Sequence, residues 1–273
     1  MPLLRTPPRV MLRSPLYAPL VGKWAPAAPS GPFNPTTLFG GSDNGGWYDA
    51  SDLTTLFQDT AGTTPVASDG DPVRLIKDKS GKGHNLRLIS GTAPVWHTGS
   101  GLSWIAFASG QFLAELTGSQ VISGTLYAGV ANKPTDNNTG NSLGILTAGT
   151  SDQFVLSRSS GGVGANYNSA GDIYTQRLAI SNNINMYAEA ATASVGSIST
   201  DVMVNKVAGS VVLNQTPAVS GATGAIGINA SSNSAGSAST QNFYAGIVIN
   251  RAITAPERAS CTTFFGAKAG LTL

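Results

Sequence analysis

The sequence contains few charged residues. Lys and Arg number 16 and Asp and Glu number 14, which is 11% of the 273 residues, against roughly 25% in an ordinary soluble domain. Disordered chains are usually rich in charge and poor in apolar residues, so the hydrophobic content of 41% argues against a disordered protein. The formal net charge of +2 is too small to indicate nucleic-acid binding. The one basic cluster is interrupted by acids, with Lys77, Lys79, Lys82 and Arg87 lying among Asp69, Asp71 and Asp78.

Cysteine and long apolar runs are also scarce. The single cysteine, Cys261, excludes an internal disulfide and a cysteine metal cluster. No apolar run approaches the ~20 residues needed to cross a bilayer. Prolines and arginines interrupt the N-terminus where the apolar core of a secretory signal would run, so we expect no such signal.

Catalytic residue types are too few and too scattered for the common hydrolytic sites. The three glutamates, Glu115, Glu189 and Glu257, lie far apart, whereas a glycosidase needs two carboxylates roughly 5–10 Å apart. The two histidines, His84 and His97, are the whole supply of imidazole bases for a serine triad, and no transition-metal ligand spacing is present. We expect no enzymatic activity, no cofactor and no bound metal.

Prolines, by contrast, are concentrated at the N-terminus, where nine of the 15 lie in the first 35 residues. Proline stops helices and cannot donate to a β-ladder, so this stretch should be extended. Its basic residues Arg5, Arg9 and Arg13 precede any acid, and its apolar residues have nothing local to pack on; they include Leu12, Leu16, Tyr17 and Trp24. We predict that residues 1–46 form an arm that docks on a partner; the alternative is a disordered leader.

Residues 47–273 have a sequence pattern typical of a β-domain. Short apolar runs are separated by Gly, Asn, Asp or Ser clusters, which favours a sandwich or barrel. The predicted strands include 126–130, 154–156, 202–204, 211–213 and 243–249. The last is apolar on both faces, so it should lie in the middle of a sheet. Segments 159–171 and 229–242 are predicted to be loops.

One helix is expected near the C-terminus. Thr254 and Glu257 have the spacing of a capping box, and Pro256 falls in the first turn. Cys261 and Phe265 are four residues apart and define an apolar stripe, so we interpret Cys261 as a small buried side chain.

Three segments resemble concanavalin A-like, laminin G-type domains of tailed-phage and prophage virion proteins. They are WYDASDLTTLFQDTAGTTPVASDGDPVRLIKDKSGKGHNL at 47–86, APVWHTGSGLSWIAFASGQFLAEL at 93–116 and FYAGIVINRAITAPERASCTTFFGAKAGL at 243–271. They occur in the family's order and cover both ends of the region 47–271, while the middle resembles it only in texture.

The resemblance implies a jelly-roll sandwich of two antiparallel sheets, followed by a short C-terminal helix. Within the family's Asp-Lys-Ser-Gly-x-Gly-His turn, Gly81 and Gly83 suit positive φ, and Asp78 could bond backbone amides. These are interpreted as structural, with a bound ion or sugar as the alternative. The family's Phe-Asp-Gly turn has become 107–110, Phe-Ala-Ser-Gly, which lacks the acid and lowers the expectation of a calcium site.

Aromatic side chains are the candidates for contact with a glycan. Trp96 and Trp104 lie beside predicted strands and could instead belong to the core, whereas Tyr167 lies in a predicted Gly/Asn-rich loop. The sequence therefore offers three candidates and no defined sugar site.

Together these observations predict a non-enzymatic structural protein on the surface of a virion, either a capsid decoration or a tail-associated protein. Its arm (1–46) would dock on capsid or tail proteins, and its concanavalin A-like domain (47–273) would be displayed, as copies that associate into a homo-oligomer. Two alternatives stay open: a glycan-binding tail-fibre protein that attaches to the host surface, and a polysaccharide depolymerase. Neither nucleic acid nor a membrane span is expected.

Overall fold

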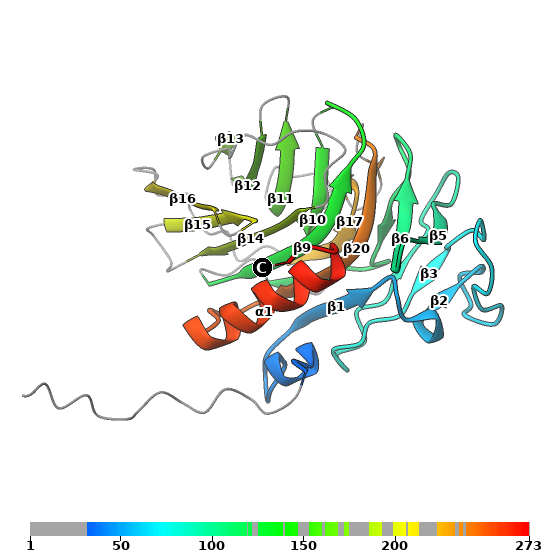
Figure 1. Cartoon of the computed structure of the whole chain (residues 1–273), viewed down its shortest axis with the longest axis horizontal. Coiled ribbons are helices and arrows are strands. Elements are labelled where there is room, and N and C mark those ends of the chain that lie inside the picture. The colour runs from blue at the N-terminus through cyan, green and yellow to red at the C-terminus, as the bar shows by residue number, and fades with distance from the viewer. Residues whose placement is uncertain are drawn as a thin grey trace, which may run out of the picture. The chain divides into compact units, whose positions relative to one another are not determined.

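Two antiparallel β-sheets stack into a sandwich, and one helix covers the outer face of the first sheet (Figure 1). The computed structural model describes residues 32–118, 120–121, 125–138, 140–146, 153–159, 162–168, 172–174, 186–192, 199–205, 207–212, 223–232, 235–236 and 239–272. The chain divides into two units, Met1–Pro32 and Phe33–Leu273. All the elements named below belong to the second unit.

The first sheet has eight strands in the described part of the chain. Its order is β16 (Val207–Val212), β15 (Ser199–Val204), β14 (Met186–Thr192), β9 (Tyr127–Pro134), β20 (Gln241–Ile249), β6 (Leu102–Phe107) and β5 (Val95–Gly99), and β1 (Gly45–Asp49) also pairs with β20. One edge of β20 pairs with β9, and its other edge is shared by β6 and β1. The predicted central position of 243–249 is therefore confirmed.

The second sheet has ten described strands, several of them only two residues long. Its order is β13 (Asp172–Tyr174), β12 (Gly162–Asn168), β11 (Gln153–Ser159), β10 (Gly140–Leu146), β17 (Thr223–Ile228), β7 (Leu113–Ala114), β4 (Leu86–Arg87), β3 (Leu75–Ile76) and β2 (Leu56–Phe57), with β8 (Gln120–Val121) paired to β17. A separate hairpin joins β18 (Ala230–Ser232) to β19 (Ala235–Gly236).

The loop predictions for 159–171 and 229–242 are wrong in part. Strand β12 pairs with β11 along seven residues of the first segment, and the second contains β18, β19 and the start of β20. Glycine, asparagine and serine are poor strand formers in isolation, but β-propensity depends on the neighbouring strand more than on local composition. Pairing with a neighbouring strand therefore overrides the local turn signal.

The main core lies between the two sheets. Val130 and Val248 from the first sheet meet Ile145 and Ile228 from the second, and all four side chains are fully buried. A second cluster lies on the outer face of the first sheet under helix α1 (Ala255–Lys268), where Phe265 is completely buried. Each face of the first sheet is thus covered by apolar contacts, which explains why β20 is apolar on both faces.

Helix α1 begins as predicted. The Thr254 hydroxyl accepts a hydrogen bond from the Glu257 amide, and the Glu257 carboxylate accepts one from the Thr254 amide, which completes the capping box. Cys261 is buried on the inner side of this helix. In the described part of the chain, no helix has the length and apolar composition needed to cross a membrane.

Residues 33–46 pack on the sandwich. A 3-10 turn, η1 (Pro35–Leu38), buries Leu38, and the Phe33 ring meets the Phe264 ring of α1 edge to face at 6.3 Å. A second 3-10 turn, η2 (Leu53–Thr55), follows β1.

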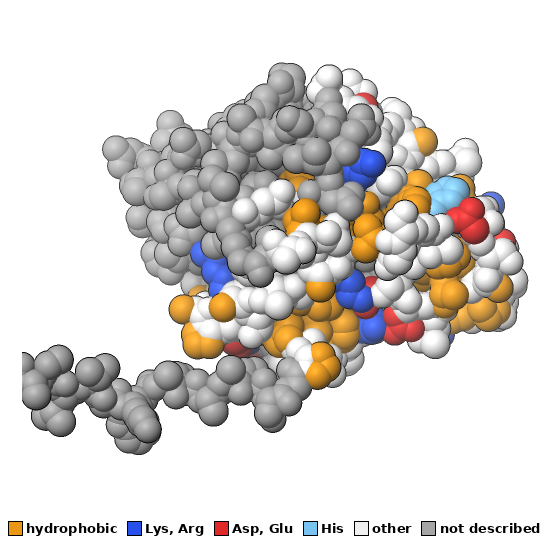
Figure 2. All heavy atoms as spheres, in the orientation of Figure 1, with side chains coloured by type: hydrophobic (Ala, Val, Ile, Leu, Met, Phe, Trp, Pro, Cys, Tyr) orange, Lys and Arg blue, Asp and Glu red, His pale blue; other side chains and the backbone are white. Residues whose placement is uncertain are grey.

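The low charge of the sequence is visible on the face drawn in Figure 2, where blue and red side chains are few.

Candidate functional site

The candidate site lies beside a tight turn between β3 and β4. Asp78 begins this turn, and its carboxylate oxygens accept hydrogen bonds from the backbone N–H groups of Ser80, Gly83 and His84 at 2.8–3.1 Å. Gly81 and Gly83 have φ values of +83° and +86°, which L side chains rarely adopt. One carboxylate and two glycines thus hold the turn and the residues that follow it in a defined position.

A buried polar cluster joins this turn to the segment after β7. His84 Nδ1 lies 2.5 Å from Glu115 Oε1, and His84 Nε2 lies 2.6 Å from Asn44 Oδ1. The second Glu115 oxygen accepts the Ile226 amide at 2.6 Å. Gln120 Nε2 lies 3.0–3.1 Å from both ring nitrogens. The His84 ring thus links the Glu115 carboxylate to the Asn44 side chain.

Tyr48 closes the cluster from the core side. Its hydroxyl donates to the His84 carbonyl oxygen at 2.6 Å, and its side chain is fully buried. Burial raises the pKa of the Tyr48 phenol well above 10, and the negative charges of Asp78 and Glu115 raise it further. The phenol therefore remains a hydrogen-bond donor at physiological pH.

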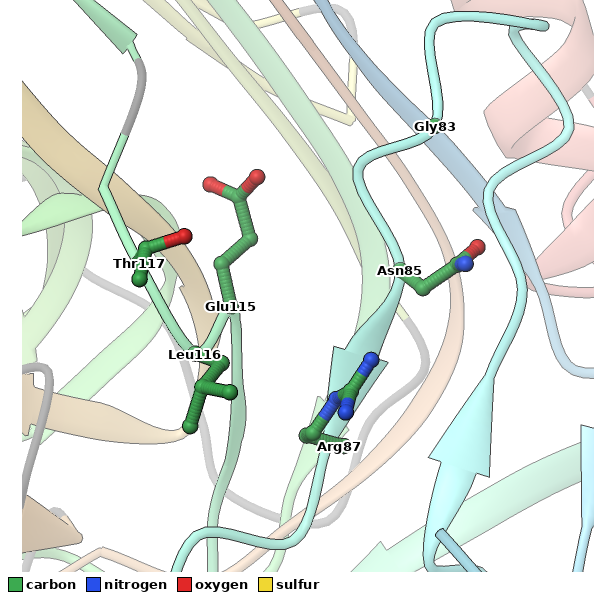
Figure 3. A pocket seen from close by; sticks show the side chains of 6 residues that line it. All are labelled: Gly83, Asn85, Arg87, Glu115, Leu116 and Thr117. Carbon is green, nitrogen blue, oxygen red and sulfur yellow. The ribbon is translucent and has the colours of Figure 1, made fainter. Parts of the chain in front are cut away.

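A shallow pocket of about 190 Å³ opens next to this cluster. Its lining consists of Gly83, Asn85, Arg87, Glu115, Leu116 and Thr117. Two chain segments form its sides: Gly83, Asn85 and Arg87 come from the turn and β4, and the other three follow β7 (Figure 3). The volume is below the ~300–1,000 Å³ of sites for drug-sized ligands, so the pocket suits one small ring or group.

The pocket combines an apolar contact with polar groups. Leu116 is 63% exposed and is the one exposed large hydrophobic side chain in the described part of the chain. Thr117 is exposed beside it, and Arg87 is half-buried. The side-chain oxygen Oδ1 of Asn85 accepts a hydrogen bond from the Asp78 amide at 2.9 Å, which orients the Asn85 side chain.

Of the aromatic residues predicted to contact a glycan, the two tryptophans do not line this pocket. Trp96 is 5% exposed and belongs to the core, where its Nε1 donates to the Ala50 carbonyl oxygen at 2.9 Å. Trp104 is half-buried on the outer face of the first sheet, between the rings of His97 and Tyr244 at 5.8 and 6.4 Å.

The other predicted residues have different positions. Tyr167 lies in strand β12 rather than in a loop, and its side chain is outside the described residues. The proposed docking residues of the arm also lie outside the described residues; they are Arg5, Arg9, Leu12, Arg13, Leu16, Tyr17 and Trp24.

The remaining acids have structural contacts. Asp71 accepts the amides of Ala67 and Ser68, and these bonds lower the pKa of its carboxyl group. Asp69 accepts the Thr98 amide, which lowers its pKa in the same way. Among the described residues, no group of three or more His, Cys, Asp or Glu side chains could hold a metal ion.

The pocket has no signature in the sequence. Glu115 is an isolated glutamate, Arg87 is part of a basic cluster, and Leu116 carries no signal of its own. The turn motif at 78–84 marks one side of the pocket. The other side, residues 115–117, is placed there by the pairing of β4 with β7, in which Arg87 lies opposite Ala114. That pairing has no local signature.

Comparisons with known proteins support the fold. No protein-family model matches the chain, and no curated protein matches it in sequence. Similar solved structures include a GH54 α-L-arabinofuranosidase soaked with a cyclic sulfate inhibitor, with a TM-score of 0.52, 12% identity and coverage of 72% of this chain and 51% of that one. The binding domain of Paraclostridial Mosquitocidal Protein 1 has a TM-score of 0.50 and 13% identity, covering 70% of this chain and 49% of that one.

These likenesses establish a concanavalin A-like β-sandwich, as the sequence predicted. The matched region spans about half the length of each solved chain. At 12–13% identity the likeness concerns the fold alone.

Proposed function

We propose that this protein is a carbohydrate-binding protein whose sugar site is the pocket beside Glu115. The observation that carries the proposal is the exposed Leu116 next to the polar groups of Arg87, Asn85 and Thr117 in one shallow pocket. A sugar ring has an apolar C–H face and a rim of hydroxyl groups. The leucine would contact the ring face, and the polar groups would bond the hydroxyls.

The fold is consistent with this role. One similar structure is named an arabinofuranosidase, an enzyme that acts on a carbohydrate, and the other is named a binding domain. Because this chain spans about half of either protein, we carry over neither activity. The β-sandwich supplies a rigid frame from which loops can present a sugar site.

We propose binding without hydrolysis. Hydrolysis of a glycosidic bond requires two carboxylates on either side of the bond. The pocket lining contains one carboxylate, Glu115, and both of its oxygens accept hydrogen bonds from the protein. Glu257 belongs to the cap of α1 and forms an ion pair with Arg251.

A glycan array followed by calorimetry on the full-length protein tests the proposal. We expect Leu116→Ala and Thr117→Val each to weaken binding of an array hit about fivefold or more, since each removes a contact of roughly 1 kcal/mol. Thr263→Val, on the exposed side of α1, changes the same chemistry away from the pocket and should leave binding unaltered. Absence of any glycan ligand, or equal loss in the control, would refute the proposal.

The position on a virion is a separate proposal that rests on the resemblance of three sequence segments and on the composition of the arm. The similar structures described above do not bear on it. We propose that residues 1–32 dock the protein on a particle while the sandwich binds glycan, so that the arm and the pocket act independently.

A further inference from the structure

The hydrogen-bond acceptors of the pocket are already occupied. Glu115 Oε1 faces His84 and Oε2 accepts the Ile226 amide, while the side-chain oxygen Oδ1 of Asn85 accepts the Asp78 amide. Each of these oxygens keeps a second lone pair, but each already has a partner within the protein.

The donors of the same pocket are free. The Arg87 guanidinium forms no hydrogen bond or ion pair with any residue in the described part of the chain, and its Nε is buried without a hydrogen-bond partner. Figure 3 shows the Arg87 side chain at β4, whereas the Asn85 side chain points away from the segment that carries Glu115, Leu116 and Thr117. A half-buried guanidinium without an anion is electrostatically uncompensated.

The negative charge of Glu115 does not neutralise the positive charge of Arg87. The carboxylate is buried, with 6% of its side chain exposed, and lies 2.5 Å from the His84 imidazole. No ion pair between Arg87 and Glu115 is present in the described structure. Each charge therefore has its own surroundings: Glu115 is paired within the protein, and Arg87 faces the pocket.

We propose that the sugar bound in this pocket carries a carboxylate group, which pairs with the Arg87 guanidinium. This inference rests on the proposed carbohydrate-binding function and specifies its ligand class. The planar guanidinium presents parallel N–H donors that match the two oxygens of a carboxylate. The Thr117 hydroxyl then bonds a neighbouring oxygen, and the Leu116 side chain contacts the ring.

Matched pairs of sugars test this assignment by calorimetry with the full-length protein. One pair is cellobiouronic acid and cellobiose, and the other is 3′-sialyllactose and its methyl ester. Each pair differs by the charged carboxylate, and the two pairs distinguish a uronic from a sialic acid. We expect the acidic member of at least one pair to bind about tenfold more tightly, the range of a charge-assisted hydrogen-bonded pair.

Variants of arginine show where this preference originates. Arg87→Gln should reduce the preference to about twofold or less, whereas Arg87→Lys should retain part of it because the charge remains. Arg74→Gln removes the same charge from an exposed position outside the pocket lining and should leave the preference unchanged. Thermal unfolding of each variant establishes that it is folded.

The outcomes separate this inference from the proposed function. Equal affinity for acidic and neutral members, or a preference that survives in Arg87→Gln, overturns the carboxylate assignment while leaving carbohydrate binding intact. If none of the four sugars binds although the array yields a neutral ligand, the assignment is also overturned. An array without any ligand overturns both.

Discussion

At the scale of single residues, the buried His84–Glu115 pair is the costliest feature of the site to disturb. We expect Glu115→Gln to lower the free energy of unfolding by about 3–5 kcal/mol, because the amide cannot accept from both His84 and the Ile226 amide and leaves a buried partner unpaired. Urea unfolding at pH 7 measures the change.

The matched comparison is Glu257→Gln, which alters an ion pair near the surface. Its partner Arg251 lies 2.7 Å away, and about a quarter of each side chain is exposed. Removal of this ion pair should lower the free energy of unfolding by about 1 kcal/mol or less. Equal costs for the two substitutions would contradict the distinct roles assigned to these glutamates.

Glu257 also predicts how stability depends on pH. Its hydrogen bonds with Arg251, together with the bond from the Thr254 amide, lower the pKa of its carboxyl group from 4.5 to about 2. A lowered pKa in the folded state stabilises the fold above the unfolded-state pKa, and this contribution is lost as pH falls from about 4.5 to about 2.

Glu257→Gln should therefore flatten the acid dependence of stability within that window. The urea concentration at the midpoint of unfolding, measured at pH 7, 4 and 2.5, should decrease less with falling pH for the variant than for the unmodified protein. An identical acid profile in both proteins would show that the carboxyl group contributes nothing in this range.

At the scale of elements, the contact between α1 and the first sheet depends on a glycine. A Cβ added to Gly129 of β9 would overlap the Phe265 ring of α1 and approach the Tyr127 hydroxyl at 2.8 Å. The helix lies close to the strand because that side chain is absent, and Phe265 is fully buried as a result.

We expect Gly129→Ala to destabilise the protein by about 1–3 kcal/mol through overpacking. In the double variant Gly129→Ala/Phe265→Leu, part of that cost should be recovered relative to the sum of the single changes, because leucine has no ring at the point of overlap. Urea unfolding of all four proteins measures the coupling. Strict additivity would mean that the helix moves away rather than resisting the added methyl group.

At the scale of the whole molecule, the question is where the sandwich begins. Leu38 and Phe39 are 1% and 8% exposed, and the Arg251 guanidinium donates to the Leu38 carbonyl oxygen at 2.8 Å. Deletion of residues 1–32 should therefore leave the free energy of unfolding and the sugar affinity close to those of the full chain.

Deletion of residues 1–46 removes the two buried side chains and should cost several kcal/mol, at about 1.5–3 kcal/mol for each. Urea unfolding of both truncated proteins distinguishes these cases. If the virion proposal holds, the 1–32 deletion will also fail to join particles while still binding glycan; normal incorporation of the truncated protein would refute the docking arm.

Local chemistry in the sequence was enough to predict several features. The capping box of α1 and the burial of β20 on both faces follow from residues within a few positions of one another, where propensity and periodicity act directly. The resemblance of three segments to a known family predicted the β-sandwich, and the similar solved structures support that fold. The strand β12 was missed because its pairing with β11 compensates for a composition typical of loops.

The site itself was decided by tertiary structure. The sequence by itself determined an all-β chain with a capped C-terminal helix and a glycine-rich turn at 78–84. It could not place Arg87 beside Leu116, or pair His84 with Glu115, because these contacts join segments about 30 residues apart through sheet pairing. Pairing between strands is set by the complementarity of whole sheets rather than by any local pattern, so the pocket, the buried His84–Glu115 contact and the position of the Arg87 guanidinium emerge only when the sandwich closes.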